Sequence, residues 1–204
     1  MKLLFISLGC DKNLVDSEQM LGLLEKEGHT FTHDETEAEA IIINTCCFIN
    51  DAKEESINTI LEMAEHRKSG ACKALIVTGC LTQRYHQEIQ NEIPEVDAIL
   101  GTTAYDALPE ILKNTLNGQK AQKLESLDRL IKPQTSRQLT TGGHYAHLKI
   151  AEGCNKHCTY CIIPRIRGPY RSIPMEELLE EASRLASQGV KELILVAQET
   201  TLYG

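Results

Sequence analysis

The stretch Lys2-Leu-Leu-Phe-Ile-Ser-Leu-Gly-Cys10 opens the chain as an apolar run that ends in a glycine and a cysteine, and a second segment follows over residues 13–26. A short apolar run of this kind is typical of a buried strand. The spacing of Leu14, Leu21 and Leu24 in the next segment is that of a helix with one apolar face. The same unit, a strand and then a helix, recurs as far as residue 116, and this recurrence decides the fold.

The first part of the chain, residues 1–118, contains all of these units. We expect strands over residues 2–8, 40–44, 73–78 and 97–100 and helices over 13–26, 52–66, 83–92 and 105–116. Alternation of this kind predicts an α/β domain with a Rossmann-like parallel sheet and helices on both of its faces.

The remainder divides into a linker and a second domain. Residues 119–143 lose the periodicity and are rich in polar residues and glycine, so we expect a linker there. Residues 144–204 resume the pattern, with a strand over 147–151, a loop over 152–172, a helix over 174–187 and a strand over 192–197. Two strands and one helix cannot close a sheet or a barrel, so we expect this part to be the truncated start of a larger domain.

Charge and composition narrow the range of partners. The net charge of −8 lies entirely in residues 1–143, and aromatic residues make up only 4% of the chain, with no Trp. An acidic surface with few aromatic side chains disfavours direct binding to nucleic acid, which needs basic grooves and stacking platforms. A protein partner remains compatible with this charge.

Eight cysteines in 204 residues are too few for a secreted disulfide scaffold, and their clustering favours metal binding in a reducing compartment. The apolar run near Met1 is shorter than a signal peptide needs, and it leads directly into charged residues. No run approaches the length of a membrane span. We therefore expect a cytoplasmic protein without a membrane association.

Three cysteines follow the expected strands at the same point. Cys10 comes after the first strand, Cys46 after the second and Cys80 after the third. The carboxyl ends of parallel strands share one edge, where such folds bind ligands, so these residues can converge on a metal site. The alternative is that they are small buried core residues. We expect Cys72, at the opposite edge, to be structural, and Cys47 not to be a ligand.

A second set of three cysteines lies within eight residues, Cys154-Asn-Lys-His-Cys158-Thr-Tyr-Cys161. Three thiolates with no fourth would leave one iron of an iron–sulfur cube open to another ligand. Zinc, with His157 as the fourth ligand, is the main structural alternative. A disulfide would leave one thiol over and suits a reducing compartment poorly.

Several neighbours of this loop are candidates for ligand contacts. Tyr160 could lie against a bound adenine, and the carboxylate of Glu199, which follows the last strand next to Gln198, could bind an ammonium group on the same rim. Basic side chains place positive charge near the loop and could hold an anion or offset a cluster's negative charge: Lys156, Arg165, Arg167 and Arg171. Ordinary loop packing and a solvated basic loop are the alternatives.

The Cys-x3-Cys-x2-Cys spacing of the loop matches the signature of radical S-adenosylmethionine (SAM) enzymes. Together with the three cysteines of the first domain, the chain resembles the methylthiotransferase family of these enzymes. Gly9-Cys10-Asp11-Lys12-Asn13 is similar to the branch that modifies ribosomal protein S twelve, whereas the tRNA branch usually reads Gly-Cys-Gln-Met-Asn there. The loop over 162–172 and the strand end over 197–204 resemble the same branch.

The resemblance implies a fold, cofactors and partners. The fold would be an N-terminal methylthiotransferase domain followed by the start of a radical SAM partial TIM barrel. The cofactors would be SAM, contacted by Tyr160 and Glu199, and two 4Fe-4S clusters, one held by each set of cysteines: Cys10, Cys46 and Cys80, and Cys154, Cys158 and Cys161. The reaction would add a methylthio group to an aspartate β-carbon of ribosomal protein S twelve, or of the small ribosomal subunit that contains it, with a reducing electron donor. No catalytic residue beyond the cluster ligands is implied.

The sequence departs from the family in two respects. Glu199 stands where an aspartate is expected, and the rest of the barrel and the C-terminal TRAM domain are missing. Because of the second departure, this stretch alone could be inactive. Methylthiolation of a tRNA adenosine and a non-catalytic iron–sulfur module are the competing functions that the residues leave open.

Overall fold

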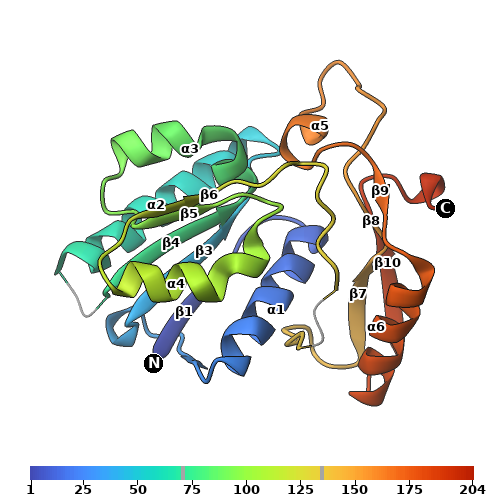
Figure 1. The fold of residues 1–204 in the computed structure, drawn as a ribbon, viewed down its shortest axis with the longest axis horizontal. Coiled ribbons are helices and arrows are strands. Elements are labelled where there is room, and N and C mark those ends of the chain that lie inside the picture. The colour runs from blue at the N-terminus through green and yellow to red at the C-terminus, as the bar shows by residue number, and fades with distance from the viewer. Residues whose placement is uncertain (70–71, 134–135) are drawn as a thin grey trace.

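The computed structural model describes residues 1–69, 72–133 and 136–204. Its larger part is a parallel six-stranded sheet covered by helices, and its smaller part lies at one end of the molecule (Figure 1). The strands of the sheet are β1 (Lys2–Ser7), β2 (Thr30–Phe31), β3 (Ala40–Thr45), β4 (Ala74–Gly79), β5 (Ala98–Leu100) and β6 (Ala121–Lys123). Its helices are α1 (Asp11–Lys26), α2 (Asn50–Ser69), α3 (Cys80–Glu92) and α4 (Leu108–Leu116).

The strand order of the sheet is β2-β1-β3-β4-β5-β6, and each neighbouring pair is parallel. This is a doubly wound, flavodoxin-like order, in which the chain reverses its direction of progress between β1 and β3. The register aligns Ser7 with Asn44 and Asn44 with Thr78, so the carboxyl ends of β1, β3 and β4 lie level with one another. The expected α/β class with a parallel sheet is confirmed.

Both faces of the sheet are buried, which explains why its central strands are apolar without interruption. On one face, Leu24 of α1 and Leu108 of α4 pack against strand residues that include Ile42. On the other face, Ile60 of α2 and Leu81 of α3 pack in a second core cluster with the remaining strand side chains. The helices therefore form two layers around the sheet, as the alternation of strands and helices predicts.

Several details differ from the sequence-based expectation, which did not include β2. Residues 121–123, within the segment expected to be a linker, form β6 and add a parallel strand beside β5. Polar side chains in that strand are accommodated because it lies at the edge of the sheet. The expected helix over 105–116 begins as a 3-10 turn, Tyr105–Ala107, before α4, which has a proline in its first turn. Short 3-10 turns also occur at Glu35–Glu37 and Thr200–Leu202.

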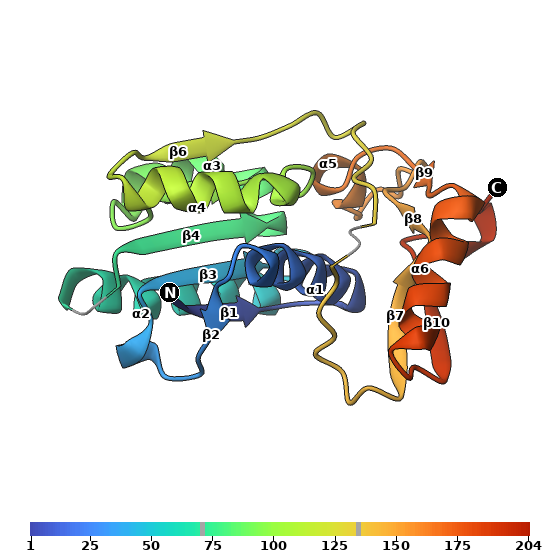
Figure 2. The ribbon, with the colours of Figure 1, turned by 60° about the horizontal axis from the view of Figure 1, so that its bottom comes forward.

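The smaller part is built around two parallel strands, β7 (Tyr145–Lys149) and β10 (Glu192–Val196), which α6 (Met175–Ser187) connects. A short antiparallel pair, β8 (Ala151–Glu152) with β9 (Arg171–Ser172), and the single turn α5 (Ile163–Ile166) complete it. Two views place this part beyond the carboxyl ends of the six-stranded sheet (Figure 1, Figure 2). Among the described residues, no helix has the length and apolarity needed to cross a membrane.

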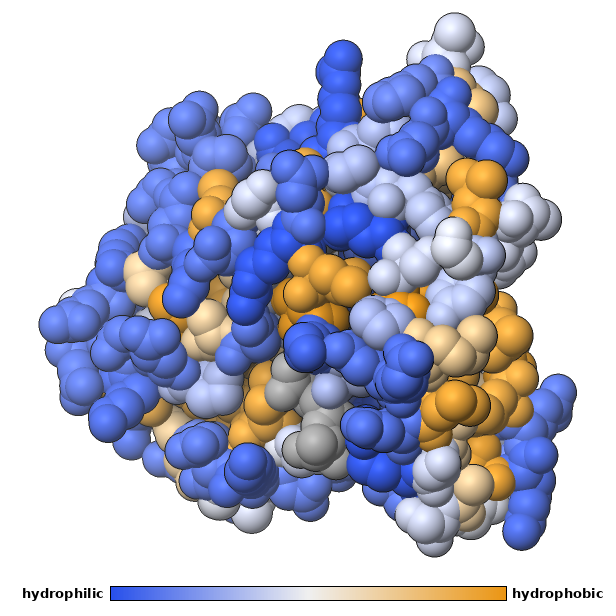
Figure 3. Space-filling model, turned by 45° about the vertical axis from the view of Figure 1, so that its right-hand side comes forward, coloured by the Kyte–Doolittle hydropathy of each residue, from blue (hydrophilic) through white to orange (hydrophobic). Residues whose placement is uncertain are grey.

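The strand β10 is unusually apolar for an exposed edge strand. Ile194 is 38% exposed and Leu195 is 56% exposed, and β10 has β7 as its neighbour in a sheet of two strands. Apolar side chains gather on this side of the molecule in the space-filling view (Figure 3). An apolar edge strand of this kind is normally covered by another element.

A buried ion-pair network joins the two parts. Arg137 lies between them and donates to Glu18 of α1 at 2.9 Å and 2.5 Å and to Glu181 of α6 at 2.7 Å. All three side chains are at most 4% exposed. Because an unpaired buried charge costs several kcal/mol, each of these groups holds the others in place.

The core clusters yield a test of the fold. Leu24→Ala, in α1, removes a fully buried side chain and should lower the free energy of unfolding by about 3 kcal/mol. The matched change Leu61→Ala, in α2, acts on a side chain that is 47% exposed and should cost less than about 1 kcal/mol. Urea unfolding followed by circular dichroism measures both, and equal losses would contradict this packing of α1 and α2.

Candidate functional site

Three cysteines follow the level carboxyl ends of β1, β3 and β4, at one edge of the six-stranded sheet. Cys10 caps the N-terminus of α1 just after β1, Cys46 follows β3, and Cys80 is the first residue of α3 after β4. The edge between β1 and β3 is the point at which the strand order reverses, which is where doubly wound sheets bind ligands. Cys46 and Cys80 are each 5% exposed, whereas Cys10 is exposed, so the site opens on the side of Cys10.

Two glycines let the backbone come close to this site. Gly9 has φ +97°, and a Cβ there would lie 2.6 Å from Cβ and 2.9 Å from Sγ of Cys46. Gly79 has φ +99°, and a Cβ there would lie 2.4 Å from the carbonyl oxygen of Thr45. Both positions therefore require glycine for conformation and for space. We call these two close approaches, of Gly9 to Cys46 and of Gly79 to Thr45, the glycine cradle.

Buried polar side chains fix the strand ends. The Ser56 hydroxyl accepts from the backbone N–H of Cys46 at 3.0 Å and donates to its carbonyl at 2.8 Å. The Asn13 amide donates to the carbonyl of Leu8 at 2.6 Å and to that of Thr45 at 3.2 Å. These bonds satisfy backbone groups that the sheet leaves unpaired, so the loops that carry Cys10 and Cys46 are held rigidly.

The two remaining cysteines of the larger part make backbone contacts. The Cys47 thiol donates to the carbonyl of Cys80 at 3.2 Å, and burial raises its pKa to about 12, so it stays protonated at neutral pH. The Cys72 thiol donates to the carbonyl of Ala74 at 3.3 Å, at the start of β4 and thus at the opposite edge. That neither residue is a metal ligand stays a prediction.

Arg167 is a site residue that the sequence did not assign to this edge. Its side chain is 3% exposed and reaches Cys80, one of the three strand-end cysteines. Nε donates to Sγ of Cys80 at 3.3 Å, and Nη2 donates to Oδ1 of Asn13 at 2.6 Å. Nη1 donates to Asp16 at 2.7 Å and to Glu152 at 3.2 Å.

A balanced set of charges surrounds Arg167. Lys149 of β7 pairs with Asp16 and, at 3.0 Å, with Glu152. Although burial disfavours a charged carboxylate, Lys149 and Arg167 outweigh it and lower the pKa of Glu152 to about 2. Burial likewise opposes the charge of Lys149, but Asp16 and Glu152 raise its pKa above the ordinary value. The apolar spacing of α1 gives no sign of this network, because Asp16 lies among polar residues of the helix.

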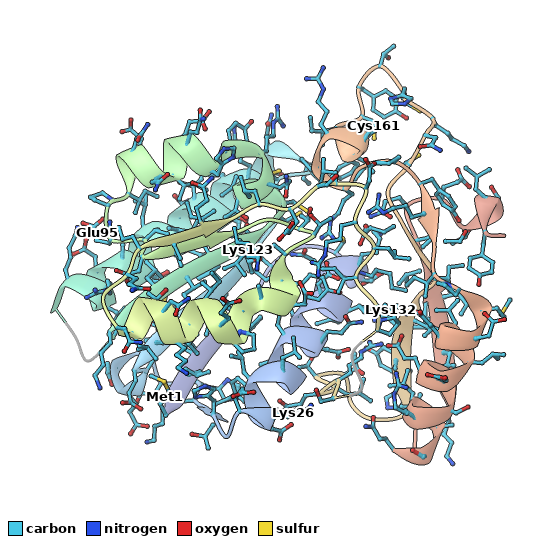
Figure 4. The ribbon with its side chains drawn as sticks, viewed as in Figure 1. Met1, Lys26, Glu95, Lys123, Lys132 and Cys161 are labelled. Atoms are coloured by element: carbon cyan, nitrogen blue, oxygen red, sulfur yellow. The ribbon has the colours of Figure 1, made fainter. Side chains whose placement is uncertain are left out.

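The loop with the second set of cysteines lies between β8 and α5. Cys161 lies beside α5, at the far side of the molecule from Met1, which precedes β1 (Figure 4). The Cys154 N–H donates to the carbonyl of Gly168 at 3.1 Å, and the Cys161 N–H donates to the carbonyl of Cys158 at 2.9 Å. Cys158 is exposed and the other two are partly exposed, so this set is open to solvent.

Tyr160 and Glu199, the residues expected to contact a ligand near this loop, differ in exposure and in hydrogen bonding. Tyr160 is 89% exposed, so its ring lies in solvent. Glu199 pairs with Lys156, whose hydrogen bond is the main cause that lowers the pKa of the carboxyl to about 2. Gln198 accepts from the N–H of Gly153 at 3.0 Å and donates to Glu152 at 2.7 Å. Since β7 and β10 are parallel, the end of β10 lies on the same rim as the loop, as expected.

The surroundings of the three strand-end cysteines suit an anionic iron–sulfur cluster. Among the described residues, no group of three or more Cys, His, Asp or Glu side chains is arranged to hold one metal ion. Thiolates that bind separate irons of a cube need not converge on one point. At the strand ends, three thiols, the two-glycine cradle, a cationic hydrogen bond to Cys80 and the N-termini of α1 and α3 suit an anionic cluster.

The comparisons with known proteins cover both parts of the chain. Residues 2–101 match the uncharacterized protein family UPF0004, and residues 148–204 match the radical SAM superfamily. The chain is 65% identical to the ribosomal protein uS12 methylthiotransferase RimO of Lachnoclostridium phytofermentans and 48% identical to that of Clostridioides difficile, in each case over all of this chain and 46% of the relative. The RimO of Clostridium botulinum is 53% identical over 98% of this chain and 45% of that protein. The chain thus spans about half the length of the curated relatives it matches.

The glycine cradle yields a test of the strand-end geometry. Gly9→Ala places a methyl group against Cys46, whereas Gly28→Ala, at a similar φ of +82°, meets no atom within 4 Å. Both changes carry the strain of a positive φ, about 1–2 kcal/mol, but the first adds a steric clash of about 1–3 kcal/mol. Urea unfolding should show the larger loss for Gly9→Ala, and equal losses would contradict the close approach of Gly9 to Cys46.

Proposed function

The chain belongs to the family of the RimO methylthiotransferases, and on this premise we propose that it is the cysteine-bearing half of an enzyme that adds a methylthio group to uS12. The acceptor we propose is the β-carbon of an aspartate in that ribosomal protein. The position of Cys10, Cys46 and Cys80 after three level strand ends at the switch point of the sheet carries the proposal, because it supports a second three-cysteine site in addition to the radical SAM loop.

Each set of cysteines would hold one 4Fe-4S cluster through three thiolates and would leave one iron without a protein ligand. The cluster on Cys154, Cys158 and Cys161 would supply the electron that generates a radical from SAM, and the cluster at the strand ends would supply the sulfur site. An unactivated C–H bond requires this chemistry, since no side-chain base removes such a proton at neutral pH.

The residues of the chain orient these two sites. Gln198 holds Gly153 at the start of the cysteine loop, and Glu199 lies beside the loop in an ion pair with Lys156, in a position to exchange that partner for the ammonium group of SAM. Tyr160 extends from the loop into solvent, where an adenine ring could cover it. Cys10 leaves the strand-end site open on one side for a sulfur ligand and the substrate.

The remaining half of the longer relatives would complete the enzyme. The strand β10, in which Ile194 and Leu195 are exposed, is the edge strand to which further strands of a barrel would add. All eight cysteines are free thiols, and clusters of this kind and a ribosomal substrate suit the reducing cytoplasm. We therefore propose that the present stretch binds its clusters but that activity requires the full length.

Iron content tests the ligand assignment. After anaerobic reconstitution, the chain should hold about eight irons, and replacing Cys154, Cys158 and Cys161 with Ala should leave about half of them. Replacing Cys10, Cys46 and Cys80 should leave the other half. The matched changes Cys47→Ala and Cys72→Ala should retain all of the iron. Zinc in place of iron, or loss of iron in Cys47→Ala, would overturn the assignment.

The substrate is tested with the full-length protein. Reconstituted enzyme with SAM and a reductant is offered uS12 and a tRNA pool in separate reactions. Mass spectrometry should find a methylthio group on an aspartate of uS12 and none on tRNA. Modification of tRNA alone would contradict the proposed substrate. We expect no modification of tRNA because the N-terminal part of the chain is acidic and would repel its phosphates.

A further inference from the structure

Two buried arginines join the parts of the molecule, and they differ in one contact. Arg137 directs its donors to carboxylates, those of Glu18 and Glu181. Arg167 also pairs with carboxylates, those of Asp16 and Glu152, but its Nε donates to Sγ of Cys80. A role limited to joining the two parts would not need this contact, because the carboxylates are also paired with Lys149.

The backbone around Arg167 is tied to both sets of cysteines. The next residue, Gly168, accepts a hydrogen bond from the N–H of Cys154 at 3.1 Å. The preceding residue, Ile166, is fully buried in the core cluster that contains Cys80, and its carbonyl accepts from the Thr102 hydroxyl at 2.8 Å. The side chain therefore reaches one cysteine site while its neighbour in the chain anchors the other.

We propose that Arg167 is a positioning residue for the iron–sulfur site at the strand ends, where it orients Cys80 and donates a charge-assisted hydrogen bond to the ligand sulfur. This inference rests on the function proposed above. A hydrogen bond to a ligand sulfur stabilises the more negative, reduced state of a cluster and so raises its reduction potential. The planar guanidinium suits the role because it can serve sulfur, amide and carboxylate acceptors at fixed angles, which an ammonium group cannot.

The test uses the chain with Cys154, Cys158 and Cys161 replaced by Ala, so that the strand-end site alone binds a cluster. In this background, Arg167→Lys keeps the positive charge but loses the directed bond to sulfur. The midpoint potential, measured by a dithionite titration followed by electron paramagnetic resonance, should move to a more negative value. Arg167→Met, which also removes the charge, should move it at least as far.

Arg137→Lys is the matched control, because Arg137 is a buried arginine of the same interface that, among the described residues, donates to Glu18 and Glu181 and not to a cysteine. It should lower the melting temperature about as much as Arg167→Lys does but leave the midpoint potential unchanged. Loss of iron in Arg167→Lys, with full iron in Arg137→Lys, would also support the proposal, since Cys80 would then be misplaced. If Arg167→Met does not fold, Arg167→Lys alone decides.

Two results would overturn the proposal, and they are distinguishable. Full iron and the same midpoint potential in Arg167→Lys and Arg137→Lys would show that Arg167 only joins the two parts, while the proposed function stands. Absence of iron from the background chain itself would instead remove Cys10, Cys46 and Cys80 as ligands, and with them both the proposed function and the role of Arg167.

Discussion

The level carboxyl ends of β1, β3 and β4 are the constraint on which the rest of the structure depends. The parallel register brings Cys10, Cys46 and Cys80 to one edge although they are far apart in the sequence. The reversal of strand order between β1 and β3 opens the space between the loops that follow these strands. Gly9 and Gly79 allow the backbone to lie close to Cys46 and to Thr45 at this edge. A shift of one residue in the register would move a cysteine away from the edge and break the site.

The smaller part of the molecule is held against this edge by buried charges. Asp16 and Glu18 of α1 face it, and Lys149, Arg167 and Arg137 supply the opposite charges. Buried ion pairs add little net stability, but each fixes geometry because leaving one partner unpaired costs several kcal/mol. The network thus favours one arrangement of the two cysteine sites over others.

The sequence predicted the parts of this structure that depend on local patterns. Uninterrupted apolar runs such as that over 40–44 indicate strands buried on both faces, and the cysteine after each run indicates the shared edge. The patterns could not reveal β6, because residues 121–123 are mostly polar and their pairing with β5 is set by tertiary contacts. From the sequence, Arg167 is assigned to a basic loop near the second set of cysteines. Its contact with Cys80 depends on the tertiary fold, which local patterns do not indicate. Polar residues such as Asp16 pair with residues of the smaller part of the molecule, and the spacing of apolar residues in the helix does not indicate this interface.

The most direct test of the account is an anaerobic crystal structure of the reconstituted chain with anomalous scattering measured at the iron edge. The account predicts two separate iron clusters, one bonded to Cys10, Cys46 and Cys80 at the ends of β1, β3 and β4, and one bonded to Cys154, Cys158 and Cys161. Each cluster should have one iron without a cysteine ligand, and Arg167 should lie against the sulfur of Cys80. A single cluster, or a strand-end cluster that takes Cys47 as a fourth ligand, would contradict it.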